Sequence, residues 1–369
     1  MRTRAWISGL ALPGLLLSAG PLVAQSSFRP ITGVYLERYT FKQPEAVDIR
    51  TLTLWTIPFG AEIAAGSRVL FTLNGSYARA VLGRPDGTEA TLDGLTDSEI
   101  SARVATSDGA ASVTGIVQLP TGSSRLSGDG LFAAGAIAAD LLPFRITNWG
   151  TGGGAGMAVA VARPLGAFVV GASVGYVVAR SFEPLDAQAF EYRPGNQFQV
   201  QAAIDRTIGR SAKAAFKVGW QRYGTDQGDG QNLFQTGDRL RLVGSLDFAI
   251  GQSKAIAYAG WLKRGEGEFS EATDLLPAQR LGYGGFGFRK SIGSVVLQPS
   301  LDVRVLDTDG ADRHGYTAGL GAALELPLAG TVFAPGVRGR LGRIEAQDGA
   351  ESTFNGVEMG LAVRFGARK

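Results

Sequence analysis

The sequence predicts an all-β fold, a transmembrane antiparallel β-barrel of about sixteen strands, with fourteen as the alternative count. Three observations predict it. Long stretches alternate apolar and polar residues, the connections between them are short and long in turn, and the octet Glu358 to Phe365 has the layout polar-x-Gly-x-x-apolar-x-aromatic. Such alternation gives a wall with one face for lipid and one for water. The octet alone would also fit the last strand of a soluble sandwich.

The N-terminus predicts an export signal. Two arginines precede an apolar stretch, and small residues follow it, all within the first 25 residues. This is the layout of a cleaved secretory signal, and the apolar stretch is too short to span a membrane as a helix. We predict a signal peptide over 1–24, cut after Ala24 or alternatively near Ser26, and a barrel over 25–369.

The composition excludes several other classes of protein. Removing the two basic residues of the signal leaves 34 basic and 33 acidic residues, a net charge of +1, so charge gives no reason to expect nucleic acid as a partner. The absence of Cys excludes a disulfide framework and a lipid-anchored cysteine. The most apolar region, 154–179, is cut by Arg163-Pro164-Leu165-Gly166, which favours a hairpin over a spanning helix.

Period-two alternation places the strands in order along the chain. We predict strands near 31–42, 48–60, 67–81, 96–106, 111–119, 153–163, 167–181, 192–207, 211–223, 238–250, 253–265, 281–291, 294–307, 314–328, 331–343 and 353–366. Short links carry the Gly that tight turns favour, as at Gly209 and Gly251. An even count puts both termini in the periplasm and the long loops outside. The first five strands are the least regular.

A helical segment is predicted between the fifth and sixth strands. From Ser127 to Leu142 the chain is rich in Ala and has apolar residues near helical spacing. We expect a short helix within 127–144, in an outer loop, where its apolar face would cover the mouth of the barrel. A seventeenth strand is the alternative, and it would require another strand to be misplaced near the N-terminus.

The terminal octet resembles the C-terminal signal by which bacterial outer-membrane barrels are recognised and inserted. The residues that carry the resemblance are Glu358, Gly360, Val363 and Phe365. It implies a place in the outer membrane, with outer-membrane lipid and lipopolysaccharide around the wall and the barrel assembly machinery as a partner.

Charged residues fall on the predicted inner face. By alternation, this face carries Arg239, Arg241, Asp247, Asp302, Arg304, Glu325, Arg338, Arg340, Glu358 and Arg364. Mixed charges can pair across neighbouring strands and hold a wet interior together. They can also set selectivity, and the excess of Arg would favour anionic solutes wherever those Arg are unpaired.

Three short motifs resemble a family of outer-membrane proteins associated with phenol meta-degradation, itself similar to the long-chain fatty-acid transporters. They are Leu95-Thr96-Asp97-Ser98-Glu99, Leu119-Pro120-Thr121-Gly122 and Tyr192-Arg193-Pro194-Gly195, in the family's order. The resemblance covers about 95–195 and the last strand. It implies a monomeric barrel that admits hydrophobic molecules. The family's N-terminal plug is not recognisable here.

Catalysis and metal binding find little support. His314 is the only His and no nucleophile elbow accompanies it, although triad partners can meet from distant positions. Asp226, Asp229 and Asn232 resemble a calcium loop only loosely, and we expect a mobile polar loop there. We predict no enzyme activity, no cofactor and no metal site.

The expected function is passive uptake of small hydrophobic or amphipathic solutes, such as aromatic compounds or fatty acids. A general diffusion porin is the alternative, and a structural or adhesive barrel is a third. For an apolar solute the predicted capture residues are Leu131, Phe132, Ile137, Leu141, Leu142 and Phe144. They could equally serve only to pack the segment onto the wall.

Overall fold

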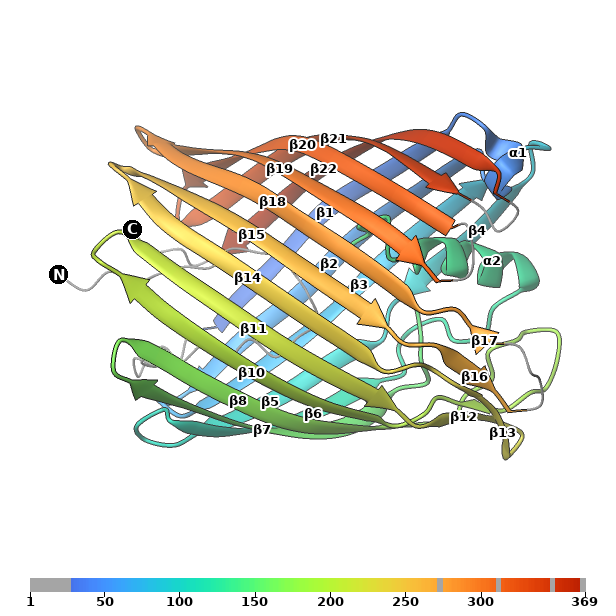
Figure 1. Ribbon diagram of the computed structural model, residues 1–369, viewed down its shortest axis with the longest axis horizontal. Helices are drawn as coiled ribbons and strands as arrows, with labels where there is room; N and C mark the ends of the chain where they lie inside the picture. The colour runs from blue at the N-terminus through green and yellow to red at the C-terminus, as the bar shows by residue number, and fades with distance from the viewer. Residues whose placement is uncertain (1–27, 271–274, 310–312, 346–348, 366–369) are drawn as a thin grey trace.

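The chain forms a closed antiparallel barrel (Figure 1). The computed structural model describes residues 28–365 apart from 271–274, 310–312 and 346–348. The predicted signal peptide therefore lies outside the described residues. Each wall strand pairs with its neighbours in sequence, and the first pairs with the last, from Ile31 opposite Arg364 to Phe41 opposite Phe354. The sheet therefore has no free edge.

Sixteen strands make the wall, because β4 and β5 are two pieces of one strand that both pair with β3. The wall strands are β1 (Phe28–Phe41), β2 (Thr51–Ala65), β3 (Val69–Gly83), β4 and β5 (Glu89–Leu95 and Ser98–Ala105), β6 (Ala111–Leu119), β7 (Gly154–Leu165), β8 (Phe168–Ala179), β10 (Gln197–Ile208), β11 (Ala212–Tyr223), β14 (Arg239–Ile250), β15 (Ser253–Arg264), β18 (Gln279–Ile292), β19 (Val295–Thr308), β20 (Arg313–Leu328), β21 (Thr331–Glu345) and β22 (Glu351–Phe365). The predicted fold class and strand count are confirmed, and the alternatives of fourteen strands and of a strand near 127–142 are wrong.

Three predicted strand limits are wrong for local reasons. The second strand begins at Thr51 and not at 48, because the short helix α1 (Pro44–Val47) precedes it. The fourth begins at Glu89 and is broken at residues 96–97. The eighth begins at Gln197, because Pro194 and Gly195 separate it from β9 (Tyr192–Arg193). Proline lacks the N–H that a continuous ladder would need.

Both described ends of the chain lie at the end of the barrel that has the short turns. There β10 turns into β11 at Gly209 (φ 59°) and β14 into β15 at Gly251 (φ 58°), left-handed conformations that suit glycine. The opposite end carries the long connections, including residues 120–153 and 224–238. In bacterial outer-membrane barrels the short turns face the periplasm and the long loops face outward. We propose the same orientation here and call the long-loop end the outer end.

The outward face of the wall is apolar. Its exposed side chains include Val34, Ile57, Leu73, Val117, Val159, Val174, Ile204, Phe216, Leu301, Leu320, Val337 and Leu361. Toward the outer end the same face carries exposed Trp55, Tyr77, Tyr176 and Tyr316. An apolar band flanked by aromatic residues is typical of a wall in contact with lipid. No helix in the described part of the chain is long and apolar enough to cross a membrane.

A second, small sheet stands on the outer end. It is formed by β9, β12 (Thr225–Gly228), β13 (Gln231–Gln235), β16 (Gly267–Phe269) and β17 (Leu275–Leu276). Figure 1 shows β12, β13, β16 and β17 beyond the ends of the wall strands. The prediction of a mobile polar loop around Asp226 and Asp229 is therefore wrong. The chain there is a hairpin, held by cross-strand bonds to its neighbours.

The predicted helix is present as α2 (Gly128–Ile137). The Ser127 Oγ caps it by accepting a hydrogen bond from the Gly130 N–H at 3.1 Å. Ala133 and Ile137 are fully buried against wall residues such as Leu82 and Leu92. These wall residues belong to the face opposite the apolar band, so the segment packs against the inner wall.

The seam between β1 and β22 depends on close approach of rings to glycine. A Cβ added at Gly360 would lie 2.3 Å from Cδ1 of Tyr35, because the tyrosine ring lies flat over this glycine. We predict that Gly360→Val will weaken barrel closure by about 1–3 kcal/mol, the usual cost of overpacking. The measurement is the temperature at which heat-modifiable gel migration is lost.

Gly339→Val is the matched control for Gly360→Val, because Gly339 is on the neighbouring strand β21 and a Cβ there meets nothing within 4 Å. Equal losses in the two variants would show that the Tyr35 contact does not limit closure.

Candidate functional site in the barrel lumen

A network of paired charges lines one side of the lumen. Arg340 holds Asp302 through two contacts, Nη1 to Oδ2 at 2.6 Å and Nη2 to Oδ1 at 3.3 Å, and it also binds Glu358. Arg338 adds a 3.1 Å ion pair with Asp302, and the Tyr39 hydroxyl donates to Glu358 at 3.0 Å. The network joins β19, β21, β22 and β1. Two-point contacts between Arg and a carboxylate fix side chains in place.

Glycines on β20 make these contacts geometrically accessible. Strand β20 lies between β19 and β21, and it places Gly319 opposite both Asp302 and Arg340. A Cβ at Gly319 would lie 2.9 Å from Arg340 Nη1, and one at Gly321 would lie 2.9 Å from Arg338 Cβ. The two arginines therefore cross β20 at positions that have no side chain, and in this way they reach Asp302 on β19.

A smaller ion cluster lies toward the short-turn end. Glu325 is buried and binds Arg289 at 2.5 Å and Arg364 at 3.2 Å. Four of the six predicted lumen cations are thus placed as follows: Arg338, Arg340 and Arg364 bind carboxylates, and Arg304 donates to the main-chain oxygen of Asp140 at 3.2 Å.

The opposite wall carries cations without carboxylate partners. Arg239 and Arg241 on β14, Arg264 on β15 and Lys217 on β11 face inward, and in the part of the chain that the structure describes none of them forms an ion pair. Arg239 and Arg264 are direct cross-strand partners. Like charges in register destabilise a sheet, so this arrangement costs stability. We call these four residues the basic wall.

The predicted inner-face anion Asp247 is also separate from the network. It lies opposite Lys213, but the ion pair of Lys213 is with Asp205, at 2.8 Å. No ion pair of Asp247 occurs among the described residues.

The inner segment, residues 120–153, is fastened to the wall by one carboxylate. Asp97, in the break between β4 and β5, accepts from Gly122 N–H at 3.0 Å with one oxygen. Its other oxygen accepts from the N–H and the hydroxyl of Thr151 at 2.7 and 2.8 Å. The Asp97 N–H donates to the carbonyl of Trp149. Two of the predicted motifs, around Asp97 and around Thr121-Gly122, therefore meet in one clasp that holds both ends of the segment.

Most predicted capture residues lie inside the packing of this segment. Ile137, Leu141, Leu142 and Phe144 are buried, and they contact Tyr39, Leu52, Leu82 and Phe354 of the wall. Only Leu131 is exposed, and Phe132 is half-buried under the guanidinium of Arg84. Four of the six side chains thus pack the segment onto the wall, and solute capture at these positions stays a prediction.

The end of the inner segment lies against β1. Arg145 places its guanidinium carbon 3.5 Å from the centre of the Tyr35 ring, and its N–H donates to Glu37 at 3.3 Å. Glu37 is buried on the inner face. Sequence reasoning missed both residues, because their contacts join segments more than a hundred residues apart.

Arg264 and Lys217 were also missed, although strand alternation would have placed both on the inner face with Arg239 and Arg241. Arg264 was overlooked at the end of a strand, where the boundary between strand and loop is least certain from sequence.

The residues considered for chemistry have structural contacts. His314 lies on the outward face, with Nδ1 2.9 Å from Asp307. Asp226 accepts from Gly195 N–H at 2.7 Å and from the Tyr192 hydroxyl, and Asp229 accepts from Glu191 N–H. Burial and the bond to Asp226 raise the pKa of the Tyr192 hydroxyl. No cluster of three metal-binding side chains occurs among the described residues.

The octet residues lie on both faces of β22. Glu358 belongs to the paired network, and Gly360 lies beneath the Tyr35 ring. Val363 and Phe365 face outward at the short-turn end, and Phe365 is exposed.

Comparison with known proteins does not identify the family of this chain. No family profile and no curated protein matches the chain, so the motif-based resemblance stays a prediction. Solved structures with a similar fold include the outer membrane channel DcaP of Acinetobacter baumannii (TM-score 0.46, 12% identity, covering 96% of this chain and 100% of that one). Another is an anion-selective porin from Comamonas acidovorans (TM-score 0.44, 11% identity, covering 93% and 100%). These sequence identities and TM-scores are too low for the function of either protein to be assigned to this chain.

We predict that Asp97→Ala will loosen the inner segment, because each hydrogen bond to a charged group contributes about 1.5–3 kcal/mol. Single-channel recordings should show larger and noisier conductance, and trypsin should cut faster after Arg125 or Arg145.

The control for Asp97→Ala is Asp93→Ala, because Asp93 is on the same strand and its side chain, among the described residues, accepts a hydrogen bond only from the Tyr77 hydroxyl, at 3.4 Å. If the Asp97 variant keeps the conductance and the rate of trypsin cleavage of the wild type, the clasp is not what holds the inner segment in place.

Proposed function

We propose that the protein is an outer-membrane channel for passive uptake of small amphipathic organic anions, such as aromatic carboxylates. The observation that carries the proposal is the basic wall, four inward cations that form no ion pair within the described ranges. A barrel of sixteen strands leaves an aqueous channel. The inner segment occupies one side of this lumen, and the basic wall lines the other.

Charge along the inner surface supports a preference for anions. On the β19–β22 side Arg338 and Arg340 are bound to acids, so their charge is compensated locally, and Arg304 is bound to a main-chain oxygen. On the β11–β15 side Arg239 and Arg264 lie near the outer end, and Arg241 and Lys217 follow deeper along the strands. Charged rings of one sign in a pore select for the opposite sign.

Aromatic side chains beside the basic wall support an amphipathic solute. Tyr283 faces the lumen opposite Arg304, and its ring lies over Gly260. Its buried hydroxyl has no hydrogen-bond partner among the described residues. The Tyr283 ring offers stacking to an aromatic solute, and the neighbouring Arg241 and Arg304 offer hydrogen bonds to its carboxylate.

A general diffusion porin is the second candidate, because a wide aqueous lumen would also pass neutral solutes below a size limit. Liposome swelling separates the two. We predict that benzoate will enter proteoliposomes faster than a neutral sugar of similar mass. Equal rates would favour the general porin, and preferred entry of cations would contradict the proposal.

We predict that replacing Arg241 and Arg264 together by Gln will reduce anion preference. At a Coulomb energy of about 1 kcal/mol per charge in water, the ratio of chloride to potassium permeability should fall roughly fivefold or more. The measurement is the reversal potential across a planar bilayer in a KCl gradient.

Lys263→Gln is the matched control, because Lys263 precedes Arg264 on β15 and its exposed side chain lies on the outward face. A shift of the reversal potential in this variant as large as in the lumen variant would contradict a role for the basic wall.

A further inference from the structure

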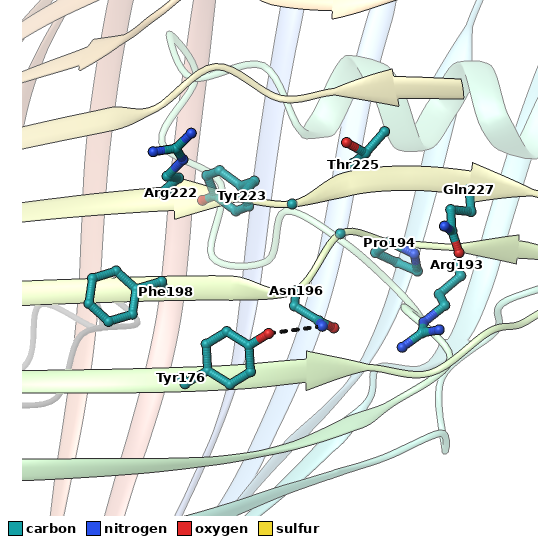
Figure 2. Close-up of a pocket in the computed structure, with 11 residues that line it drawn as sticks. Tyr176, Arg193, Pro194, Asn196, Phe198, Arg222, Tyr223, Thr225 and Gln227 are labelled. Carbon is teal, nitrogen blue, oxygen red and sulfur yellow. Dashed lines mark hydrogen bonds between the residues drawn. The ribbon is translucent and has the colours of Figure 1, made fainter. Parts of the chain in front are cut away.

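A cavity opens on the outside of the wall at the outer end. It has a volume of about 410 Å³ and lies where β8, β10 and β11 meet the small outer sheet. Its lining includes Tyr176, Phe198, Asn196, Arg222, Thr225 and Arg193 (Figure 2). Tyr176, Phe198 and Arg222 share the face of the apolar band, so on their side the cavity opens to the surroundings of the barrel.

Two cations from different parts of the fold line this cavity. Arg222 extends from β11, and Arg193 comes from β9 of the outer sheet. Both are exposed, and neither forms an ion pair within the described ranges. Figure 2 shows Arg222 and Phe198 toward the wall and Arg193 toward the outer sheet, with Asn196 between them.

The framework around the cavity is rigid. Asp226 binds the Tyr192 hydroxyl and the Gly195 N–H, one on each side of Arg193. A Cβ at Gly195 would lie 2.0 Å from the Gly224 carbonyl oxygen, so only glycine allows the two chains to approach this closely. Asn196 donates to the Tyr176 hydroxyl at 3.0 Å. The Tyr192-Arg193-Pro194-Gly195 motif therefore positions an arginine.

Apolar and aromatic surface continues from the cavity toward the centre of the wall. The Phe198 ring packs edge-on against Trp220, with centroids 6.0 Å apart, and Val200 and Val174 follow on the same outward face. Below the two arginines the surface therefore suits acyl chains, whereas at their level it suits anionic groups.

We propose that this cavity binds the bisphosphorylated headgroup of a glycolipid in the outer leaflet, with one phosphate at Arg193, the other at Arg222, and the acyl chains along Phe198 and Trp220. Arginine matches phosphate geometry through two-point contacts. Exposed Arg38, Arg79 and Lys263 continue the positive charge at this level around the outward face. The inference rests on the membrane orientation proposed above and does not depend on what the lumen conducts.

The test is native mass spectrometry of the full barrel in detergent, titrated with bisphosphorylated lipid A and with the same lipid after dephosphorylation. We expect the phosphorylated lipid to bind at least about tenfold more tightly to the wild type, a difference of about 1.4 kcal/mol. In the double variant Arg193→Gln with Arg222→Gln, this preference should be lost. The control pair, Arg163→Gln with Arg210→Gln, removes two exposed charges near the short-turn end and should keep it.

Three outcomes would overturn the proposal. They are equal binding of both lipids by the wild type, an unchanged preference in the Arg193 and Arg222 variant, and competition by glucose 1-phosphate as strong as by the lipid, which would point to a soluble phosphate. Conductance of the same double variant is recorded separately. A barrel that binds the lipid but conducts no ions would refute the proposed channel and leave this site standing.

Discussion

The structure depends on the pairing of β1 with β22. Inside a bilayer there is no water to satisfy the main chain, so every N–H and C=O of the wall needs a partner within the sheet. The seam from Ile31 to Phe41 supplies the last of these partners. It also brings Tyr39 to Glu358, and through Glu358 to Arg340 and Asp302. Closure of the backbone and assembly of the inner charge network are therefore one event.

Glycine lets this barrel carry large side chains on its inner face while keeping them against the wall. Tyr35 lies over Gly360, Tyr258 over Gly285 and Tyr283 over Gly260. The arginines of β21 use the same device when they cross β20 at Gly319 and Gly321. At these five positions glycine has a specific cause, since an inner ring or guanidinium that lies flat needs a neighbour without a side chain.

Period-two alternation predicted the wall well, because each strand repeats its signal over about ten residues. It placed all sixteen strands, yet it missed β9, β12, β13, β16 and β17, which have only two to five residues each and too few repeats to show a period. Alternation also assigned Arg239 and Arg340 to one face but gave no way to see that Arg340 is paired and Arg239 is not. That difference depends on register: Gly319 of the neighbouring strand stands opposite Arg340, and Asp302 stands one strand further on.

The inner segment is held by the clasp at Asp97 and by apolar packing on the wall. These two sets of contacts differ in how far apart in the sequence the contacting residues are. Asp97 binds Gly122 and Thr151, all within about sixty residues of one another. Leu141 and Phe144, by contrast, rest on Tyr39 and Phe354, which come from the two ends of the sheet. Local contacts form early and long-range contacts late, because loop closure is costly. The clasp and the contacts with Leu82 and Leu92 can therefore form before the barrel closes, whereas the part of the docking surface that Tyr39 and Phe354 make together exists only on a finished barrel.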